Sequence, residues 1–239
     1  MLNIYITSAI HNEGKTFLAS GLAVTLQSLG YAVSVYKPVQ VGGIELNGFM
    51  QSPDLTYIKA LDPYINTEFS YLFREKEEPL IAAENENEYI DIDLLYNDYK
   101  KLISTSECNI LDGEGTLLSP LAPSVQNIDL IKKLQIPVVY SVTPSKDTVN
   151  TVLPSIYTAL DRGIDVKGVV INNIMPDCPK ELLTSITRII EEYSGVNILG
   201  LLPSISNPNA PEEIITGILN GIDIESIFGV KIEKLGFIS

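Results

Sequence analysis

Glu13-Gly14-Lys15-Thr16 stands directly between a strand-like segment and a helix-like segment. Before it, Leu2–Thr7 alternates apolar and polar residues, and from Phe17 onward apolar residues recur every three or four positions. A Gly-Lys-Thr at such a junction suits phosphate binding, because the glycine lets the backbone approach a phosphate and the helix N-terminus supplies positive potential. The lysine can reach the β- and γ-phosphates, and the threonine hydroxyl can bind Mg²⁺. This stretch therefore predicts a nucleotide site and a P-loop fold together.

The phosphate-loop pattern is incomplete at its start. The pattern usually opens with a glycine five residues before the glycine of Gly-Lys-Thr, and here Ala9 holds that place, preceded by Ser8. A helix N-terminus with a chance Gly-Lys-Thr would share the motif, but the strand–turn–helix order around it favours a phosphate loop. We expect the nucleotide to contact Asn12, Glu13, Gly14, Lys15 and Thr16.

Strand and helix patterns alternate along the rest of the chain. The predicted strands are Leu2–Thr7, Ala32–Tyr36, Asn109–Leu111, Pro137–Val142, Gly168–Ile171 and Ile198–Leu202. The predicted helices are Lys15–Leu29, Asp54–Leu61, Asp93–Ser104, Ile128–Leu134, Val149–Arg162 and Glu181–Tyr193. Such alternation predicts a doubly wound α/β fold, with a mostly parallel sheet and helices on both faces. Because we find no linker or repeat, we expect one P-loop NTPase-like domain over residues 1–239.

Composition narrows the class of protein. The net charge of −14 argues against nucleic acid as a partner, since nothing offsets phosphate repulsion. No apolar run approaches the ~18 residues of a membrane span, and the N-terminus carries no secretory signal, so we expect no membrane partner. Two distant cysteines, Cys108 and Cys178, suit a reducing compartment, and we expect a cytoplasmic location. The acidic stretch 75–98 is expected to be a solvated loop leading into a helix.

Polar or glycine-rich segments follow most of the predicted strands. In parallel α/β sheets the ligand lies beyond the carboxyl ends of the strands, so these segments should face it. They are residues 8–16, 37–43, 112–115, 143–150, 172–173 and 203–204.

Three charged residues in or near these segments are candidates for phosphate chemistry. Lys37 follows a predicted strand, where an ammonium could neutralise a transferring phosphoryl group, although a solvated surface lysine would look the same. Asp54 opens a predicted helix, as a Mg²⁺ ligand or merely as a residue favoured by the helix dipole. Asp112 ends a strand, where NTPases place a Mg²⁺ carboxylate, but it could also form a turn before Gly113. Glu114 is a competing carboxylate.

Several motifs occur in an order and spacing that resemble one enzyme family. They are Gly14-Lys15-Thr16, Tyr36-Lys37-Pro38-Val39 with Gly42, Ser52-Pro53-Asp54, Glu78-Pro79-Leu80-Ile81-Ala82-Ala83, Asp112-Gly113-Glu114-Gly115 with Pro120-Leu121, Asp147-Thr148-Val149-Asn150, Gly168-Val169-Val170-Ile171-Asn172 and Gly200-Leu201-Leu202-Pro203. Together they resemble the dethiobiotin synthetases, ATP-dependent enzymes of biotin synthesis, over nearly the whole chain.

The resemblance implies a reaction. In that family an amine of 7,8-diaminopelargonic acid captures CO₂ as a carbamate, which attacks the γ-phosphate of ATP, and the mixed anhydride closes to a cyclic urea. It thus implies ATP and Mg²⁺ as cofactors, diaminopelargonate and CO₂ or bicarbonate as substrates, and a homodimer. The implied roles are charge stabilisation by Lys15 and Lys37, Mg²⁺ binding by Thr16, Asp54 and Asp112, adenine contact by Asn172 and Pro203, and substrate contact by Val41, Gly115 and Asn150, the last from the second subunit.

The chain departs from the family pattern at Ser8, Ile10, Val41, Asp112 and Asp147. Val41 replaces a small hydroxyl residue near the substrate and so removes one hydrogen bond. Asp112 is one methylene shorter than the usual glutamate, so the neighbouring Glu114 or a water can share its task. Asp147 replaces a glycine near the expected carboxylate pocket, where a further negative charge would repel the substrate.

Two alternative functions therefore stay open. One is a related P-loop synthetase that acts on another carboxylate or amine. The other is a non-catalytic, partitioning-type P-loop ATPase. Partitioning ATPases typically carry an extra lysine early in the loop, where Ile10 stands here. They also often use basic or amphipathic tails, for which Lys231-Ile232-Glu233-Lys234 is a weak candidate.

Overall fold

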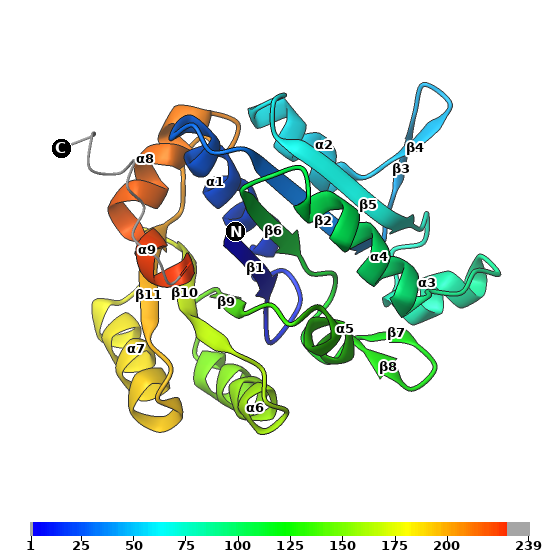
Figure 1. The fold of residues 1–239 in the computed structure, drawn as a ribbon. Coiled ribbons are helices and arrows are strands. Elements are labelled where there is room, and N and C mark those ends of the chain that lie inside the picture. The colour runs from blue at the N-terminus through cyan, green and yellow to red at the C-terminus, as the bar shows by residue number, and fades with distance from the viewer. Residues whose placement is uncertain (1, 229–239) are drawn as a thin grey trace.

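A seven-stranded sheet forms the centre of the computed structural model, which describes residues 2–228. Neighbouring strands pair in parallel throughout this sheet, in the order β11-β10-β9-β1-β6-β2-β5 (Figure 1). The strands are β1 (Leu2–Thr7), β2 (Val33–Gln40), β5 (Asn66–Leu72), β6 (Cys108–Asp112), β9 (Val138–Val142), β10 (Val166–Ile174) and β11 (Ile198–Pro203). The candidate tail at 231–234 lies outside the described residues.

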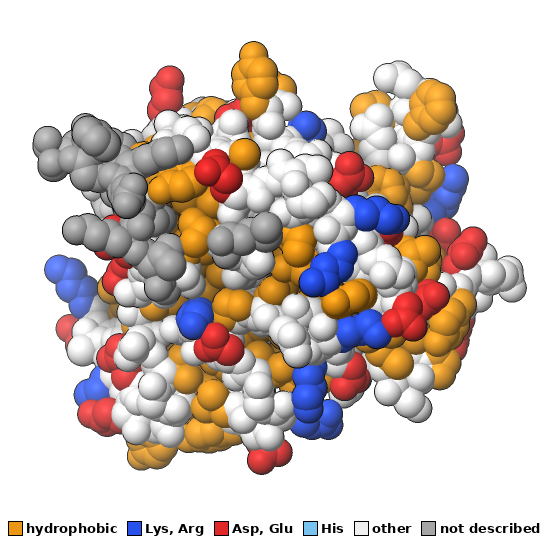
Figure 2. Space-filling view, in the orientation of Figure 1, with side chains coloured by type: hydrophobic (Ala, Val, Ile, Leu, Met, Phe, Trp, Pro, Cys, Tyr) orange, Lys and Arg blue, Asp and Glu red, His pale blue; other side chains and the backbone are white. Residues whose placement is uncertain are grey.

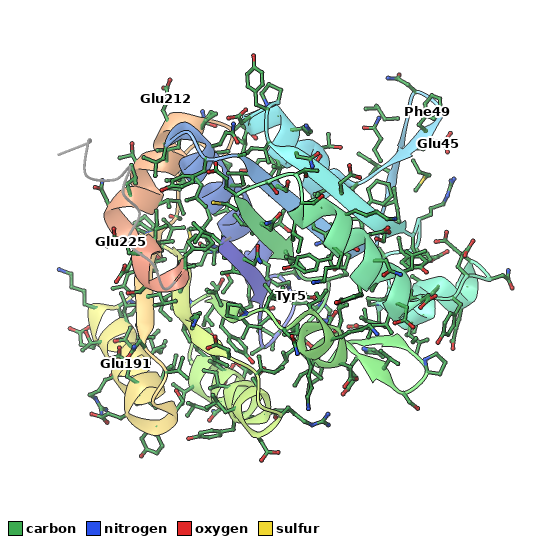
Figure 3. The ribbon with its side chains drawn as sticks, in the orientation of Figure 1. Tyr5, Glu45, Phe49, Glu191, Glu212 and Glu225 are labelled. Atoms are coloured by element: carbon green, nitrogen blue, oxygen red, sulfur yellow. The ribbon has the colours of Figure 1, made fainter. Side chains whose placement is uncertain are left out.

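Helices cover both faces of the sheet, and two small hairpins extend from its loops. The helices are α1 (Lys15–Ser28), α2 (Pro53–Leu61), α3 (Pro79–Asn85), α4 (Ile92–Ile103), α5 (Asn127–Leu134), α6 (Thr148–Asp161), α7 (Lys180–Ser194), α8 (Pro211–Gly221) and α9 (Ile224–Phe228). The hairpins are β3 (Ile44–Leu46) with β4 (Phe49–Gln51), and β7 (Pro120–Ala122) with β8 (Val125–Gln126). The first hairpin projects from the body of the molecule, and Glu45 and Phe49 lie near its end (Figure 3).

Alternation along the central strands divides the core into two layers. In β1, Ile4 and Ile6 pack in the layer formed with α1, α2, α8 and α9. Tyr5, between them, packs in the opposite layer, to which α3 to α7 contribute. Successive side chains of a strand point to opposite faces, so one sequence segment serves both layers. The arrangement confirms the predicted doubly wound, P-loop NTPase-like α/β fold.

Strand register brings the predicted site segments together at the carboxyl ends of the strands. Ile6 of β1 pairs with Asp112, the last residue of β6, and Tyr36 of β2 pairs with Leu111. The carboxyl ends of β1, β6 and β2 therefore lie side by side, as the rule for parallel sheets requires.

Several elements were not expected from the sequence, and β5, α3 and α8 are the longest of them. The edge strand β5 is half exposed and rich in polar residues, so it lacks the apolar run that marks a buried strand. Within the acidic stretch 75–98, which we expected to be a solvated loop, α3 forms and buries Ala82 and Ala83. α8 begins with Pro211, carries two glutamates in its first turn, and buries Ile214 and Ile218 against α1. Its capping signals were present in the sequence.

The surface in Figure 2 mixes acidic and basic side chains over the face shown. Among the described residues, no helix is both long and apolar enough to cross a membrane.

Candidate nucleotide and metal site

The loop between β1 and α1 has the backbone shape of a phosphate loop. Asn12 and Gly14 both have positive φ, at 61° and 72°, and Gly14 directly precedes α1. A Cβ atom on Gly14 would lie 2.3 Å from Nδ2 of Asn172, which donates a hydrogen bond to the Gly14 carbonyl at 3.0 Å. Only glycine satisfies both the backbone angle and this close approach.

Lys15 is buried and anchored by Ser8, one of the positions at which the chain departs from the family pattern. Its Nζ donates to Oγ of Ser8 at 3.0 Å, and that hydroxyl donates to the carbonyl of Ile10 at 2.6 Å. Ser8 is not among the described residues with positive φ, so a side chain is tolerated there. Burial lowers the pKa of Lys15, although the nearby carboxylate of Asp112 opposes the shift.

Lys37 lies inside β2, which corrects our expectation that it follows the strand. The strand continues to Gln40, because β2 pairs with β5 through Lys37 and Val39. The side chain is 2% exposed, and its Nζ lies 2.6 Å from Asp54 Oδ2, 3.1 Å from Asp112 Oδ2 and 3.4 Å from Glu114 Oε2. It is therefore not a solvated surface lysine.

The charges in this cluster stabilise one another. Burial alone would lower the pKa of Lys37, but the carboxylates of Asp112, Glu114 and Asp54 outweigh it and hold that pKa well above its usual value. Burial raises the pKa of Asp112 despite the attraction of Lys37. The pKa of Asp54 is lowered, because Lys37 and hydrogen bonds from its neighbours outweigh its burial. The cluster thus places one buried ammonium among three carboxylates at the carboxyl ends of the strands.

The predicted metal ligands converge on one hydroxyl. Oγ1 of Thr16 donates to Oδ2 of Asp112 at 2.8 Å and lies 3.2 Å from Oδ2 of Asp54. Oδ1 of Asp112 is buried and has no hydrogen-bond partner, so the site holds an oxygen with unused bonding capacity. These hard oxygen donors fit Mg²⁺.

The described residues contain no group of three or more acidic, histidine or cysteine side chains that could hold a metal ion by itself. Mg²⁺ commonly takes only one or two protein carboxylates and fills its other positions with water and nucleotide phosphates. The residues present therefore fit Mg²⁺ that arrives with a nucleotide.

Glu13 and Asn172 face into the protein. Oε2 of Glu13 accepts from the backbone N–H of Thr143 at 2.6 Å, and its carbonyl accepts from the hydroxyl of Ser141 at 2.5 Å. Burial raises the pKa of Glu13 to about 6. Asn172 lies within β10, not after the strand as we expected. Its Nδ2 also contacts the Ser141 hydroxyl, at 3.3 Å. These bonds tie the phosphate loop to β9 and β10.

Two cavities meet at the phosphate loop and share Asn12 and Gly14. The larger, of about 500 Å³, is lined by His11, Asn12, Glu13, Gly14, Lys15, Thr16, Lys37, Gln40, Val41, Gly42, Pro53, Asp54, Lys76 and Glu114. The smaller, of about 280 Å³, is lined by Asn12, Gly14, Phe17, Asn172, Asn173, Pro203, Ser204, Ile205 and Pro208. The expected phosphate and base contacts thus lie in adjoining cavities.

Two predicted substrate residues do not line either cavity. Gly115 is buried beside Glu114, with positive φ, and a Cβ atom there would meet Oγ of Ser119 at 2.3 Å. Asn150 is exposed on α6. Since it was expected to act from a second subunit, a single chain does not test its role.

Several residues that support or line the site are not among the predicted site residues. Ser52 caps α2 and donates to Oε1 of Gln40 at 2.6 Å, which fixes the end of β2 against the helix that carries Asp54. A serine before Pro-Asp is a recognisable capping signal. Lys76 lies over Gly42, and His11 contacts Glu78. Lys76 and Glu78 belong to the acidic stretch 75–98, which we expected to be a solvated loop. No sequence pattern indicated the contacts that they make with Gly42 and His11.

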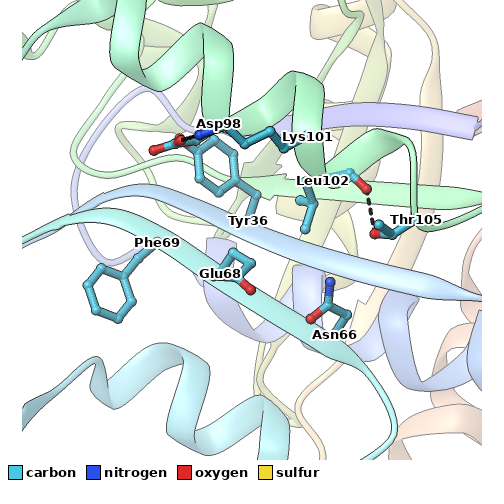
Figure 4. Close-up of a pocket in the computed structure, with 8 residues that line it drawn as sticks. All are labelled: Tyr36, Asn66, Glu68, Phe69, Asp98, Lys101, Leu102 and Thr105. Carbon is cyan, nitrogen blue, oxygen red and sulfur yellow. Dashed lines mark hydrogen bonds and ion pairs between the residues drawn. The ribbon is translucent and has the colours of Figure 1, made fainter.

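A third cavity, of about 340 Å³, lies between β5 and α4 (Figure 4). Its lining residues are Tyr36, Asn66, Glu68, Phe69, Asp98, Lys101, Leu102 and Thr105. It shares none of the predicted site residues.

The sheet order, the glycine at the start of α1 and the cluster around Thr16 define a P-loop NTPase-like protein. Residues 2–212 match a family model described as "AAA domain". A Bacillus licheniformis protein named ATP-dependent dethiobiotin synthetase BioD is 32% identical over 210 residues, which cover 87% of this chain and 88% of the relative. A Bacillus cereus protein of the same name is 29% identical over 215 residues, which cover 90% and 88%. The chain belongs to the dethiobiotin synthetase-like P-loop family.

Solved structures agree on the fold. The MinC:MinD cell division protein complex of Aquifex aeolicus matches with a TM-score of 0.57 and 13% identity, covering 97% of this chain and 97% of that one. At this identity the likeness shows the fold alone.

Proposed function

We propose that the protein is an ATP- and Mg²⁺-dependent cyclo-ligase that forms dethiobiotin from 7,8-diaminopelargonic acid and CO₂, through a carbamate and its mixed anhydride with phosphate. One observation carries the proposal: buried Lys37 contacts three carboxylates at the wall of the cavity that also contains Lys15 and Thr16. The named relatives, which are ATP-dependent dethiobiotin synthetases, support the reaction class.

The proposed roles follow from charge and position. Lys15 and Lys37 stabilise negative charge on the γ-phosphoryl group and the carbamate, since two cations converge where that charge develops. Thr16, Asp54 and Asp112 hold Mg²⁺, which would neutralise phosphate charge when bound. The backbone of Asn12, Glu13 and Gly14 contacts the phosphates, and Asn172 and Pro203 lie beside the base.

Diaminopelargonate, the second substrate, binds in the part of the larger cavity that the ATP phosphates do not fill. Val41 lines it, and Gly115 follows Glu114, whose carboxylate lies 3.4 Å from the Val41 backbone N–H. Asn150 contributes from the second subunit of a homodimer. We place this chemistry in the cytoplasm, with small molecules rather than nucleic acid or membrane as partners.

The test is an assay of purified protein with ATP, Mg²⁺, bicarbonate and diaminopelargonate, scored for dethiobiotin by mass spectrometry. We expect dethiobiotin in the complete mixture, none without the diamine, and none from Lys15→Ala; exposed Lys132→Ala is the matched control. Phosphate release that does not depend on any diamine would instead favour the partitioning-type ATPase. Phosphate release that requires another amine or carboxylate would favour the related synthetase.

A further inference from the structure

The one histidine of the chain lies at the mouth of the larger cavity. His11 belongs to the phosphate loop, lines that cavity, and has a side chain that is 54% exposed. Its Nε2 lies 2.6 Å from Oε1 of Glu78, the residue that precedes α3. This contact thus connects the phosphate loop to the N-terminus of α3 beside the larger cavity.

The contact between His11 and Glu78 fixes the orientation of the imidazole ring and the position of its proton in the neutral form. When Nε2–H donates to Glu78, the other ring nitrogen, Nδ1, is left as the acceptor in the neutral ring. A carboxylate that holds an imidazole in one orientation also stabilises the imidazolium that forms after proton transfer. The pair therefore resembles a general base, His11, with a residue that positions it, Glu78.

Glu78 has a second feature that the proposed roles do not use. Its Oε2 is buried without a hydrogen-bond partner and would lie 3.4 Å from a Cβ atom at Gly115. In the described chain only a few buried side-chain atoms lack a partner, and the one at Asp112 belongs to the proposed Mg²⁺ ligands. The Glu78 carboxylate is thus held between the phosphate loop and the residue expected to contact substrate.

The carboxylates that line the cavity, and Lys15, are engaged in other contacts. The Glu13 carboxylate accepts from the Thr143 backbone, Lys15 donates to Ser8, and the Asp54 and Glu114 carboxylates contact Lys37. Glu78 contacts His11, and the other charged groups that line this cavity are Glu13, Lys15, Lys37, Asp54, Lys76 and Glu114. Among them His11 is the one imidazole, the side chain that most often serves as a general base.

We propose that His11, positioned by Glu78, accepts the proton that the substrate amine loses when it becomes a carbamate. The inference rests on the proposed function. The neutral amine nitrogen adds to the carbon of CO₂, a C–N bond forms, and the electron pair of one C=O bond moves to oxygen. One N–H proton passes to Nδ1 of His11, and the exposed imidazolium then releases it to solvent.

A first experiment observes the contact without turnover. Because the chain has a single histidine, tag-free protein gives one imidazole Cε1–H resonance, which belongs to His11. With Mg²⁺ and a non-hydrolysable ATP analogue, saturating diaminopelargonate should shift this resonance, and Glu78→Gln should reduce the shift. Glu77→Gln, at the exposed neighbouring position, is the matched control and should leave it unchanged. An unchanged resonance at a diamine concentration that calorimetry shows to be saturating would overturn the inference.

A second experiment measures proton transfer. His11→Ala should lower kcat for the diamine by about a hundredfold or more and keep the ATP dissociation constant within about threefold of wild type, since general-base catalysis typically contributes 10²–10⁴-fold. Added imidazole should restore part of the rate of the variant. A merely structural link between the loop and α3 would not respond to imidazole.

The outcomes separate this inference from the proposed function. If wild type makes dethiobiotin and His11→Ala keeps its rate, the inference falls and the function stands. If the diamine shifts the His11 resonance in a Glu78-dependent way but no dethiobiotin forms, the function falls and the amine contact of His11 is supported.

Discussion

Lys37 illustrates how single residues determine the site. Its burial would be unfavourable alone, but the contacts with Asp54, Asp112 and Glu114 offset the lost hydration. Substituting Asp54 or Asp112 removes a carboxylate that contacts Lys37 and also removes an oxygen from the proposed metal site. Single substitutions should therefore affect both Mg²⁺ binding and stability.

For the metal ligands, we predict that Asp54→Asn and Asp112→Asn each raise the Mg²⁺ concentration for half-maximal activity by roughly tenfold or more, because even indirect loss of ligand support costs that much. A Mg²⁺ titration of phosphate release measures this. Glu114→Gln serves as the comparison. A shift in Glu114→Gln alone would assign the metal carboxylate to Glu114 instead.

For the phosphate loop, we predict that Gly14→Ala destabilises the protein by more than Gly163→Ala does. Both glycines have positive φ, so each substitution should cost roughly 1 kcal/mol in backbone strain. Nothing lies within 4 Å of a Cβ atom at Gly163, whereas at Gly14 Asn172 must move. Urea unfolding and nucleotide titration measure the difference. Equal unfolding free energies with nucleotide affinity intact would contradict the assigned geometry.

Some of these residues could be predicted from sequence and some could not. Gly14, Lys15 and Thr16 are adjacent in a motif with one structural meaning, and Asp112 ends an apolar strand. The burial of Lys37 could not be predicted, because it depends on β5, a strand that the sequence does not mark clearly. The contact of His11 with Glu78 joins residues 67 positions apart, and local patterns carry no information about it.

Secondary-structure elements were predicted well where burial is two-sided. The six expected strands all occur in the central sheet, because buried parallel strands are continuous apolar runs. β5 has one neighbour and an exposed side, so its residues are mixed. α3 has seven residues and only its Pro79, Ala82 and Ala83 buried, too short a pattern to separate from an acidic loop. Edge and short elements obtain their structure from tertiary packing.

Glu13 couples two of these elements, and its pKa predicts a pH effect. Burial raises that pKa from 4.5 to about 6, so the folded state binds more protons than the unfolded state between these values. Stability from this group is present below about pH 4.5 and is lost as the pH rises through about 6. We predict that Glu13→Gln is more stable than wild type by about 2 kcal/mol at pH 7.5 and equal to it near pH 4.

Urea unfolding at both pH values checks the Glu13 effect, with exposed Glu77→Gln as the control. The glutamine can still accept from the Thr143 backbone, so the link between the phosphate loop and the β9–α6 loop is kept. A stability difference that grows as the pH falls would have the wrong sign and would contradict a raised pKa.

The whole molecule places two cavities around one loop, and the proposed function requires a second copy of the chain. Asn150 is exposed on α6 and lies outside both cavities of its own chain. We predict a particle of twice the 26.2 kDa chain mass by sedimentation. Asn150→Ala should weaken diamine binding without changing ATP affinity. A monomer that still makes dethiobiotin would contradict the assignment of Asn150.

The central claim is that the loop before α1 binds a triphosphate whose Mg²⁺ lies beside Thr16, Asp54 and Asp112. A crystal structure with Mg²⁺ and a non-hydrolysable ATP analogue tests it most directly. We predict phosphates in the 500 Å³ cavity and the base in the 280 Å³ cavity beside Asn172 and Pro203. A nucleotide bound elsewhere, with Lys37 and the carboxylates unchanged and no metal beside Thr16, would contradict the account.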